Sequence, residues 1–423
     1  MFTSFSTALS ALNADSTAID VVGNDLANLN TPGYKATELC FSDLVTQSLG
    51  AGLGTTQVGF GVAQPVTMAQ YSQQGAIQTS GGLLDAAVQG DGFFVVTNSA
   101  GNTLYTRAGN FQTDKAGNLI TASGDFVQGW TTLDATTGQV DTNGPVGNIV
   151  VPVGTLKAPV ATTDIQAELN LNAASAADTT SDFSMPITVY DSLGGSHILT
   201  LNFQNTGGNS WSYQVSIPGA DVSGGTAGTP FDISGASGTL SFDTSGKLTS
   251  PAAGSPIMIG VTGLADGASD MNISWDPYAS DGSSTITQFA QPSAYSATSQ
   301  NGSPAVQLDQ VGMGNGGQIL AEYTDGTQVV VGQVAMASIR NPATLIATGN
   351  NTLQLSSLTA NPAIGMPGTG GRGTIVGGSV EASTVDIASE FTSLIVYQRA
   401  YEANAHVVTT ADQLSQDTIN LIH

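Results

Sequence analysis

Residues 1–35 read MFTSFSTALSALNADSTAIDVVGNDLANLNTPGYK, and this stretch decides the fold. Neither Gly nor Pro occurs from residue 1 to residue 22, so a long helix can form there. The segment Asn30-Thr31-Pro32-Gly33 then ends the pattern. Pro cannot continue a helix, and it disfavours the helical conformation of the residue before it. The sequence therefore predicts an N-terminal helix that stops near residue 30.

One face of this expected helix is apolar. Its apolar side chains recur at alternating spacings of three and four residues, interrupted at Ser16 and Gly23. The residues of this stripe are Phe2, Phe5, Leu9, Leu12, Ile19 and Leu26.

The C-terminal segment repeats the pattern. Neither Gly nor Pro occurs from Glu381 to His423, and Asp386 follows Ser383 at the spacing of a helix start. Polar residues interrupt the stripe at Gln398, Asp412 and Ser415. A helix over this segment would be roughly 60 Å long at 1.5 Å per residue. Its apolar stripe consists of Ile387, Phe391, Leu394, Tyr401, Ala405, Val408, Ile419 and Ile422.

A long helix with one narrow apolar stripe cannot bury that stripe alone. Either the two terminal helices pack together and against other copies, or each packs on the central part of its own chain. Periodicity does not separate these interpretations. We adopt the first as a hypothesis, and expect residues 1–28 and 380–423 to fold fully only when copies stack.

Between the helices the sequence favours β-structure. Short runs rich in Val, Ile, Thr and aromatic residues, such as Gly92–Val96, Leu199–Phe203 and Gln328–Val331, alternate with turns. Hairpin turns are expected at Asp114–Asn118, Asp243–Gly246 and Asp325–Gly326. The fold class expected is mainly β central domains with a coiled-coil-like helical domain formed by both ends.

The expected domain limits follow changes in composition. Residues Pro152–Thr163 and Gln291–Ser303 are rich in small and polar residues and are expected to lead into and out of an inserted domain. The glycine-rich segment 365–371 is interpreted as a linker. We expect a helical inner-core domain at 1–30 and 380–423, a connecting segment at 31–70, a β-rich inner domain at 71–158 and 301–370, an inserted β-rich outer domain at 159–300, and a linker at 371–379.

Composition excludes several partners. Eight Lys and Arg against 32 Asp and Glu give a formal net charge of −24, which argues against nucleic acid and anionic membranes. No segment predicts direct membrane insertion, and the first residues do not resemble a cleaved signal peptide. Cys40 is the only cysteine, so no intrachain disulfide can form, and we expect it to be a small apolar packing residue.

Residues that carry chemistry are scarce. His197, His406 and His423 are far apart in the sequence and lack metal-ligand spacing. Gly312–Gly317 matches a dinucleotide-binding spacing, but the following residues 318–323 predict a strand where that motif needs a helix. The loop at Asp114–Asn118 lacks the ligands of a calcium loop. We therefore predict no catalytic residue, no metal site and no cofactor.

The informative motifs are structural. The stretch Asn24–Lys35, directly after the N-terminal helix, resembles the signature of the flagellar axial proteins, the family of rod, hook and hook-junction subunits. Residues 89–96, 105–111, 381–386 and 397–405 are similar to further stretches of the same family. The motif residues carried over from the resemblance are Asn28, Asn30, Thr31, Gly33, Tyr34 and Lys35.

Within that family, length and one further motif favour the hook. Rod subunits are typically shorter, whereas this chain has room for an insert, and Val189–His197 is similar to a motif of hook subunits. The resemblance implies a structural subunit that self-assembles into a hollow, flexible tube joining rod to filament and transmitting torque. A distal rod or hook–filament junction subunit is the nearest alternative. A secreted enzyme would need a convergent polar site, and a β-rich adhesin would not need apolar stripes at both ends.

The resemblance also implies partners and a location. Besides copies of itself, the subunit would meet a distal rod protein, a hook cap protein and a hook–filament junction protein. It would pass through the flagellar type III export apparatus without a cleaved signal peptide. We therefore expect an extracellular protein of the bacterial flagellum.

Overall fold

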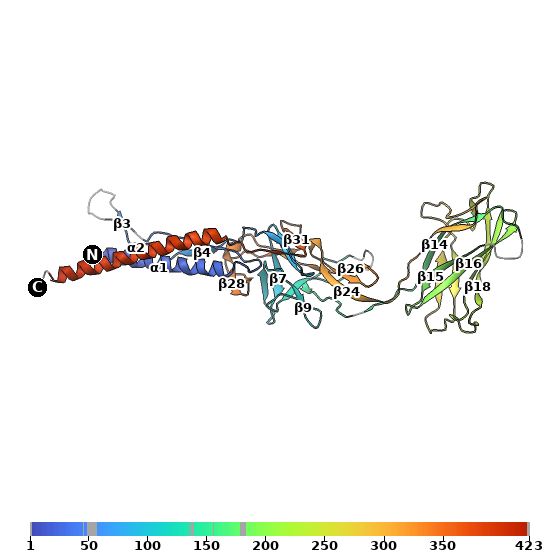
Figure 1. The fold of residues 1–423 in the computed structure, drawn as a ribbon, viewed down its shortest axis with the longest axis horizontal. Helices are drawn as coiled ribbons and strands as arrows, with labels where there is room; N and C mark the ends of the chain where they lie inside the picture. Colours follow the sequence, from blue (N-terminus) through green and yellow to red (C-terminus); the bar gives the residue numbers. More distant parts are fainter. Residues whose placement is uncertain are drawn as a thin grey trace. The chain divides into compact units, whose positions relative to one another are not determined.

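The computed structural model of the 423-residue chain describes residues 2–44, 46–48, 57–134, 137, 139–154, 156–177 and 183–420, without the side chains of residues 2, 3, 46–48, 57 and 58. The chain forms two compact units: the terminal unit, Met1–Val153 with Asp309–His423, and the inserted unit, Gly154–Leu308. Figure 1 shows two long helices in the terminal unit, and β-sheets in both units. The expected fold class, mainly β with a helical domain built from both chain ends, is confirmed.

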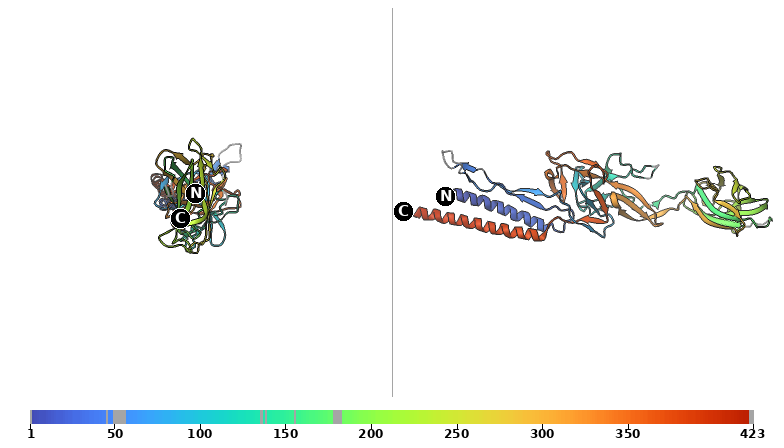
Figure 2. Two further views of the ribbon diagram at one scale, coloured as in Figure 1. Left: turned by 90° about the vertical axis from the view of Figure 1, so that its right-hand side faces the viewer. Right: turned by 90° about the horizontal axis from the view of Figure 1, so that it is seen from above.

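The two helices are α1 (Phe2–Ala27) and α2 (Ile387–Asn420). They pack side by side and antiparallel, with both chain ends at the same end of the pair (Figures 1 and 2). Within the described residues, neither helix is long and apolar enough to cross a membrane. The terminal helices thus pair with each other, as one of the two interpretations predicts.

Helix α2 begins later than the absence of Gly and Pro suggests. Its N-cap is Asp386, whose Oδ1 accepts hydrogen bonds from the backbone N–H groups of Ala388 at 2.8 Å and Ser389 at 3.1 Å. Residues 379–381 instead form β32 (Ser379–Glu381), which pairs with β5 (Ile77–Thr79). Strand pairing up to Glu381 and the Asp386 cap therefore fix the start of α2 at Ile387.

The rest of the terminal unit is built from short strands and two 3-10 turns. The main sheet follows the order β24-β25-β26-β11-β7-β8-β29-β28, with smaller pairs at its edges. The further elements of this unit are β1 (Thr37–Cys40), β2 (Thr46–Ser48), β3 (Gln57–Gly59), β4 (Val66–Ala69), β6 (Ala86–Gln89), β7 (Phe93–Thr97), β8 (Thr103–Thr106), β9 (Gln112–Thr113), β10 (Leu119–Ile120), β11 (Phe126–Trp130), β12 (Gly147–Asn148), β24 (Val306–Met313, which begins in the inserted unit), η1 (Asn315–Gly317), β25 (Gln318–Tyr323), β26 (Gln328–Val334), β27 (Met336–Ser338), η2 (Pro342–Thr344), β28 (Ile346–Gly349), β29 (Thr352–Gln354), β30 (Ala363–Gly365) and β31 (Thr374–Gly377).

Two antiparallel pairs join the segment before α2 to the body of the terminal unit. Strand β32 pairs with β5, and β31 pairs with β6. After α1, strands β1 and β4 form an antiparallel ladder in which Thr37 pairs with Ala69. The chain therefore enters and leaves the helix pair through strands that the β body holds in register.

The inserted unit is a sandwich of two sheets. One sheet is antiparallel in the order β15-β16-β17-β18-β19, and the other has the order β20-β21-β14-β22, with β23 also paired to β14. Its strands are β13 (Leu156–Lys157), β14 (Asp164–Asn172), β15 (Phe183–Tyr190), β16 (Ser196–Gly207), β17 (Ser210–Pro218), β18 (Pro230–Phe242), β19 (Leu248–Ser250), β20 (Ile257–Val261), β21 (Met271–Trp275), β22 (Ile286–Phe289) and β23 (Ala294–Gln300).

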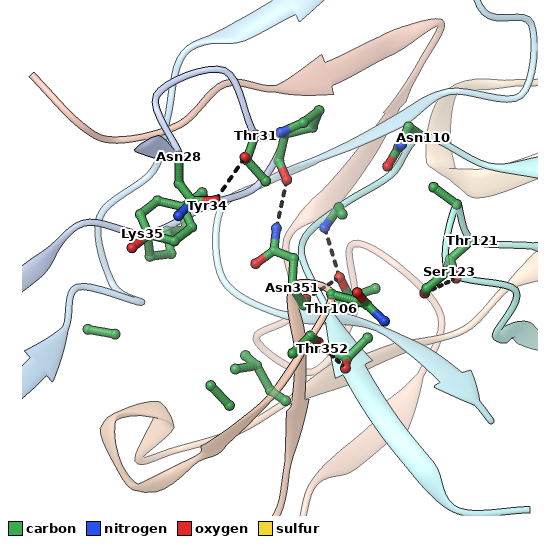
Figure 3. Close-up of a pocket in the computed structure, with 18 of the residues that line it drawn as sticks. Asn28, Thr31, Tyr34, Lys35, Thr106, Asn110, Thr121, Ser123, Asn351 and Thr352 are labelled. Carbon is green, nitrogen blue, oxygen red and sulfur yellow. Dashed lines mark hydrogen bonds between the residues drawn. The ribbon is translucent and has the colours of Figure 1, made fainter. Parts of the chain in front are cut away.

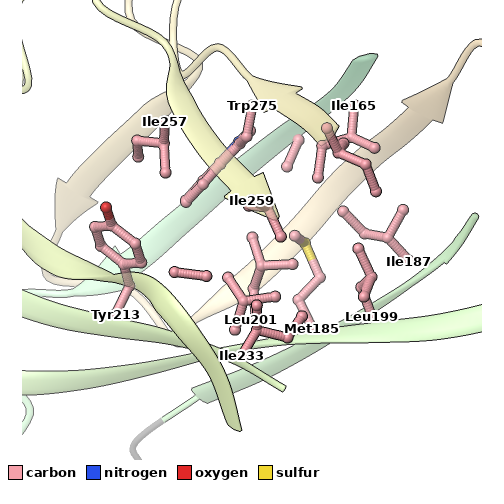
Figure 4. Packing of buried hydrophobic residues seen from close by; sticks show 14 of the residues in the cluster. Ile165, Met185, Ile187, Leu199, Leu201, Tyr213, Ile233, Ile257, Ile259 and Trp275 are labelled. Atoms are coloured by element: carbon pink, nitrogen blue, oxygen red, sulfur yellow. The ribbon is translucent and has the colours of Figure 1, made fainter. Parts of the chain in front are cut away.

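A continuous apolar core lies between the two sheets. Residues of β14, β15 and β16 alternate between buried and exposed, as strands with one face toward a core must. Figure 4 shows side chains from both sheets pointing toward one another, including Leu201, Ile259 and Trp275. Trp275 packs edge-on against Phe203 at 6.2 Å and Tyr213 at 5.6 Å between ring centroids.

The local β predictions are confirmed. The three expected hairpin turns connect β9 to β10, β18 to β19 and β25 to β26. At the first of them Asp114 Oδ1 accepts hydrogen bonds from two backbone N–H groups, so its carboxylate closes the turn. Of the glycines of 312–317, Gly316 and Gly317 lie in the turn η1, and the strand β25 follows where a helix would be needed, so the dinucleotide-binding alternative fails.

Three other expectations are wrong. Residues 291–303 are mostly β23, whose side chains are largely exposed, so a surface strand has the composition of a linker. Residues 366–371 form a turn between β30 and β31 that Arg372 holds by donating to the oxygen of Met366 at 2.8 Å, and the expected linker 371–379 contains β31 and the first residue of β32. Cys40 is exposed in β1, because its position in the β1–β4 ladder turns its side chain outward.

Candidate functional site at the base of the terminal helices

The motif identified in the sequence forms the turn that ends α1. Asn28 donates to the oxygen of Asn24 at 2.9 Å, and the Thr31 hydroxyl donates to Asn28 Oδ1 at 3.1 Å. The Tyr34 hydroxyl donates to Asp25 Oδ1 at 2.7 Å. Asn30 is exposed. This turn therefore closes on the last turn of α1 through side chains of the motif itself.

Lys35, at the end of the motif, belongs to a buried ion-pair network. Its Nζ lies 2.6 Å from Glu381 Oε1, and Arg107 Nη1 lies 3.2 Å from Glu381 Oε2. The Glu381 side chain has no exposed surface, and its Oε1 also accepts the backbone N–H of Gly75 at 2.8 Å. One carboxylate thus binds two cations that come from widely separated parts of the chain.

Backbone contacts around the network leave room only for glycine at residue 33. Gly33 has φ +70°, and a Cβ there would lie 2.6 Å from the carbonyl carbon of Arg107. Its N–H donates to the oxygen of Glu381 at 2.7 Å. The Arg107 guanidinium lies over the Phe93 ring at 5.3 Å. Gly33 therefore allows the motif turn to come into close contact with the residues after β8 and with β32.

The electrostatics of the network favour a structural role. Burial lowers the pKa of Lys35 and nearby Arg107 adds to this, whereas Glu381 opposes it. Removing one member of a buried pair leaves an uncompensated charge, which costs about 3–5 kcal/mol. The network therefore fixes how the two helices leave the β body, and the Lys35 amine is not free for chemistry.

A second buried acid stabilises the end of α1. Asp25 is fully buried, and its Oδ2 accepts the backbone N–H of Thr37 at 2.8 Å while its Oδ1 accepts the Tyr34 hydroxyl. Burial and the neighbouring Asp25 raise the pKa of Tyr34 well above its ordinary value. The Tyr34 hydroxyl therefore stays protonated and remains a donor to Asp25.

Small residues, not the predicted apolar stripe, fill the face of α1 toward α2. Asn404 Nδ2 donates to Asp15 Oδ2 at 3.0 Å across the pair, which identifies this face. The other buried side chains of α1 within about a sixth of a turn of Asp15 are Ala8, Ala18 and Val22. Small side chains permit close approach of two helices.

The predicted stripe of α1 lies beside this buried face. Phe5 and Leu9 are exposed, and Leu12, Ile19 and Leu26 are half-buried. The Phe2 side chain lies outside the described residues. The buried positions 8, 15, 18, 22 and 25, with the half-buried position 11, also alternate by three and four, one residue before the predicted stripe. This second periodic pattern was the sequence signal for the buried side of α1. It was missed because Ala and Asp are not counted as apolar residues of a stripe.

Helix α2 has no buried side chain among those described. Of the predicted stripe, Leu394, Ala405 and Val408 are half-buried, whereas Ile387, Phe391, Tyr401 and Ile419 are exposed. Ile422 lies outside the described residues. Ile395, Val396, Val407 and Leu414 are exposed apolar residues that the stripe did not include.

The exposed apolar residues of α2 form two flanks. At 3.6 residues per turn, one flank extends from about a sixth to about half a turn from the side that carries Asn404, and the other lies about a fifth of a turn away in the opposite direction. One flank consists of Ile387, Phe391, Ile395, Tyr401 and Ile419, and the other of Val396, Val407 and Leu414. We call these the long flank and the short flank. Helix α2 therefore offers apolar surface on two sides besides the side that faces α1.

A polar groove of about 800 Å³ lies next to the motif turn. Figure 3 shows Thr31, Thr106 and Asn351 along it, with Asn351 Nδ2 donating to the oxygen of Pro32 at 2.7 Å. Its lining is mostly amide and hydroxyl side chains, and its one amine, that of Lys35, is paired with Glu381. Among the described lining residues, no nucleophile lies beside a general base.

Paired terminal helices on a β body, a buried clamp at their base and a separate β insert define the class of flagellar axial subunits. Four family models agree with this arrangement. They are the flagella basal body rod protein at residues 5–35, the flagellar hook protein FlgE/F/G D1 domain at 87–165, the flagellar basal body protein FlaE D2 domain at 160–303, and the flagellar basal body rod FlgEFG protein C-terminal at 376–421.

Relatives that match over the full length of the chain identify the family within this class. The chain is 30% identical to the flagellar hook protein FlgE of Treponema pallidum over 100% of both chains, and 30% identical to that of Escherichia coli strain K12 over 99% of both. The crystal structure of Helicobacter pylori flagellar hook protein FlgE2 shares the fold, with TM-score 0.50 and 15% identity over 71% of this chain and 99% of that one. The chain belongs to the flagellar hook protein FlgE family.

Membership in this family decides the broad function. The chain is a structural subunit of the flagellar hook, located in the flagellum, where such subunits polymerise, and it is not an enzyme. The relatives span the whole chain, including the inserted unit, so the alternative of a rod or junction subunit is not supported.

Proposed function

We propose that copies of this chain assemble head to tail through the exposed sides of α1 and α2 into the hollow, flexible tube of the hook. The observation that carries the proposal is α2 itself. Its 34 residues include no buried side chain among those described, although eight large apolar side chains lie exposed on it. Exposed apolar surface of this extent marks an interaction site.

The two flanks of α2 suit a wall of neighbouring helices. A helix with apolar surface on one side can form only a pair, whereas one with α1 on one side and a flank on each of two others can lie within a layer. Contacts between the long flank of one copy and a different surface of the next are heterologous. Such contacts generate an open helical tube when the rotation does not close.

Assembly would also complete the folding of the helix pair. The pair is held within one chain by small residues and by the bond between Asp15 and Asn404. Covering the flanks with neighbouring copies adds apolar burial at about 25 cal/mol per Å². The predicted stripe residues Phe5, Leu9, Ile387, Phe391, Tyr401 and Ile419, with the half-buried Leu12, Ile19, Leu26, Leu394, Ala405 and Val408, would therefore carry self-assembly.

The motif turn and the network around Glu381 would set the direction of the helices in the tube. All four strong contacts of the Glu381 carboxylate and carbonyl come from Lys35, Arg107, Gly75 and Gly33. A fixed exit for both helices gives every copy the same orientation relative to its own β body. Torque applied to the β bodies would pass to the inner helices through this clamp.

Low surface charge would let the tube bend. Charged residues make up only 9% of the chain, so neighbouring β surfaces would meet mainly through neutral side chains. Few ion pairs would then have to break when contacts on one side of a curved tube shorten and those on the other lengthen. This supports a flexible coupling between rod and filament.

Further partners follow from family membership. A hook subunit polymer has two ends, so the distal rod protein, the hook cap protein and the hook–filament junction protein would contact the same terminal surfaces at those ends. Export through the flagellar type III apparatus, without a cleaved signal peptide, would bring the subunit outside the cell.

The test is Phe391→Asp. Phe391 is 51% exposed in the long flank, so the substitution should leave the monomer folded. In a polymer it would bury an unpaired carboxylate at every subunit contact, which costs several kcal/mol. We expect no tubes in sedimentation and electron microscopy of purified protein, while circular dichroism of the dilute monomer is unchanged. Leu394, half-buried in the helix pair, is a less clean choice.

Leu358→Asp is the matched control. Leu358 is 77% exposed and lies after β29, outside the helices, so the same substitution should leave polymerisation intact. Tubes formed by Phe391→Asp at the wild-type concentration would refute the proposal. Loss of tubes in both variants would also count against it, because the effect would then not be specific to α2.

A further inference from the structure

His197 lies at one end of the sandwich of the inserted unit, at a point where both sheets contribute acidic side chains. It is the second residue of β16, and Asp191 lies just after β15 in the preceding turn. Asp221 follows β17, and Asp266 lies in the loop between β20 and β21. The fold thus collects one histidine and three carboxylates that the sequence spreads over 76 positions.

The imidazole ring is held at both nitrogens. Nδ1 lies 3.0 Å from Asp221 Oδ2, and Nε2 lies 2.9 Å from Asp191 Oδ2 and 3.7 Å from Asp266 Oδ2. The His197 side chain is only 8% exposed and that of Asp191 is fully buried. Nε2 therefore faces two carboxylate oxygens, whereas Nδ1 faces a third.

These distances match a metal-ligand set. Two ligands at about 2.0–2.1 Å from a tetrahedral ion lie roughly 3.3 Å apart, and the two distances from Nε2 lie on either side of that value. The ligand atoms of Asp191, His197 and Asp266 all fall within 4.8 Å of one another. A carboxylate on the far ring nitrogen, here Asp221, is the usual partner that orients a metal-binding histidine.

Gly195 lets the backbone pass close to the two oxygens. A Cβ there would lie 2.5 Å from Asp191 Oδ2 and 3.1 Å from Asp266 Oδ2, so a larger residue would force these side chains to move. Asp191 Oδ1 accepts the N–H groups of Leu193 and Gly195, which fixes the carboxylate so that Oδ2 faces Nε2. A bond from Ser269 N–H to Ser192 Oγ at 3.0 Å joins the two loops.

The protein supplies no second cationic partner for these acids. Within the described residues, the ion pairs of Asp191, Asp221 and Asp266 are all made with His197. Three carboxyl groups thus surround one imidazole ring, and one of the three is fully buried. A divalent cation would offset the negative charge gathered there, bound by Nε2 without its proton.

We infer that Asp191, His197 and Asp266 form a site for a divalent transition-metal ion, with Asp221 orienting the histidine. One imidazole nitrogen with two carboxylate oxygens suits Zn²⁺, Mn²⁺ or Co²⁺, whereas Ca²⁺ takes six to eight oxygen ligands. Water would complete the coordination at the exposed side of Asp266. The ion would tie the turn 191–195 to the loop that holds Asp266, and so link the ends of the two sheets.

The site is independent of polymerisation. All four residues belong to the inserted unit, whereas the proposed assembly surfaces are on α1 and α2 of the terminal unit. Binding to the folded state alone would raise the thermal stability of the inserted unit by mass action. It would not require any second copy.

The experiment is titration of chelator-treated full-length protein with ZnCl₂ by calorimetry, with CoCl₂ absorption spectra to report nitrogen and oxygen ligands. We expect one ion per chain and a higher unfolding temperature. Asp266→Asn removes a ligand at the exposed rim, and we expect it to abolish saturable binding. Asp221→Asn should weaken binding by about 10–100-fold, the effect typical of an outer partner of a metal-bound histidine.

Asp281→Asn is the matched control. Asp266 Oδ1 accepts the N–H of Ala268 at 2.9 Å, and Asp281 Oδ1 accepts that of Ser283 at 2.9 Å, so the substitution preserves the same kind of turn at both places. The control should bind like the wild type. No saturable binding by the wild type, or equal binding by Asp266→Asn, would overturn the inference and leave His197 as an imidazolium paired with carboxylates.

Discussion

The helix pair and the inserted sandwich bury their apolar residues in opposite ways. In the sandwich, large side chains such as Trp211, Phe203 and Trp275 have no exposed surface and form one continuous core. In α2, no described side chain is buried, and apolar residues occupy two exposed flanks. One region buries its hydrophobic surface within the chain, whereas the other leaves it exposed.

This difference separates two roles within one sequence. A closed core makes the inserted unit stable whether or not the chain is assembled. In the proposed assembly, an incomplete core would make the helix pair marginal in the monomer and stable in the polymer, so assembly and full folding of the ends would be coupled. Substitutions should therefore act on the monomer when they fall in the sandwich and on the polymer when they fall on the flanks.

The largest effect on monomer stability is expected from Trp275→Ala. Trp275 fills the space between the sheets against Phe203 and Tyr213, so truncation leaves a cavity. Replacing a buried aromatic residue by Ala costs about 3–5 kcal/mol. Hydrogen exchange of peptides from β14 to β22 during urea unfolding measures this loss.

Met258→Ala is its control on the same sheet. Met258 is exposed on β20 directly opposite Ser274 of β21, and we expect a change of about 0.5 kcal/mol or less. Equal losses for the two variants would mean that the sandwich core is not the source of stability. Neither substitution should alter the exchange of α2 peptides.

A smaller effect is expected inside the helix pair from Asn404→Ala. The substitution removes the donor to the mostly buried Asp15 carboxylate, and an unsatisfied buried acceptor costs about 1–3 kcal/mol. We expect the protein concentration at which tubes form to rise by roughly 5–150-fold. Gln413→Ala, exposed on the same helix, is the control and should leave that concentration unchanged. An unchanged onset for Asn404→Ala would show that the bond to Asp15 does not stabilise the pair.

The sequence predicts the elements better than it predicts their contacts. The end of α1 before Pro32 and the three hairpin turns follow from local chemistry, because Pro, Gly and Asp act on their own backbone. The face of α1 toward α2 does not, since Ala8 and Ala18 carry little apolar signal and are buried only because a partner helix is close. Burial by close approach cannot be seen in one sequence.

The side-chain networks around Glu381 and around His197 could not be predicted from the sequence for a different reason. Glu381 meets Lys35 across 346 positions, and His197 meets Asp266 only when the two sheets pack. Each residue is ordinary among its sequence neighbours. The motif Asn24–Lys35 pointed to Lys35 through resemblance to a family, whereas its partner Glu381 emerged only from the fold.

The smallest effect is expected from Glu390→Gln, and it depends on pH. Burial, then Asp25 and Asp386, raise the pKa of Glu390 above its ordinary value of 4.5. A raised carboxyl pKa stabilises the folded pair below pH 4.5, and that stability is lost as pH rises through the folded pKa. The amide introduced by the substitution cannot ionise, so at neutral pH we expect the variant to keep its helical circular dichroism to a higher temperature than the wild type. The difference should vanish below pH 4.5, and Glu402→Gln, exposed on the same helix, should show no such crossover. A variant that melts with the wild type at every pH would mean that the acids at the base of the pair do not repel one another.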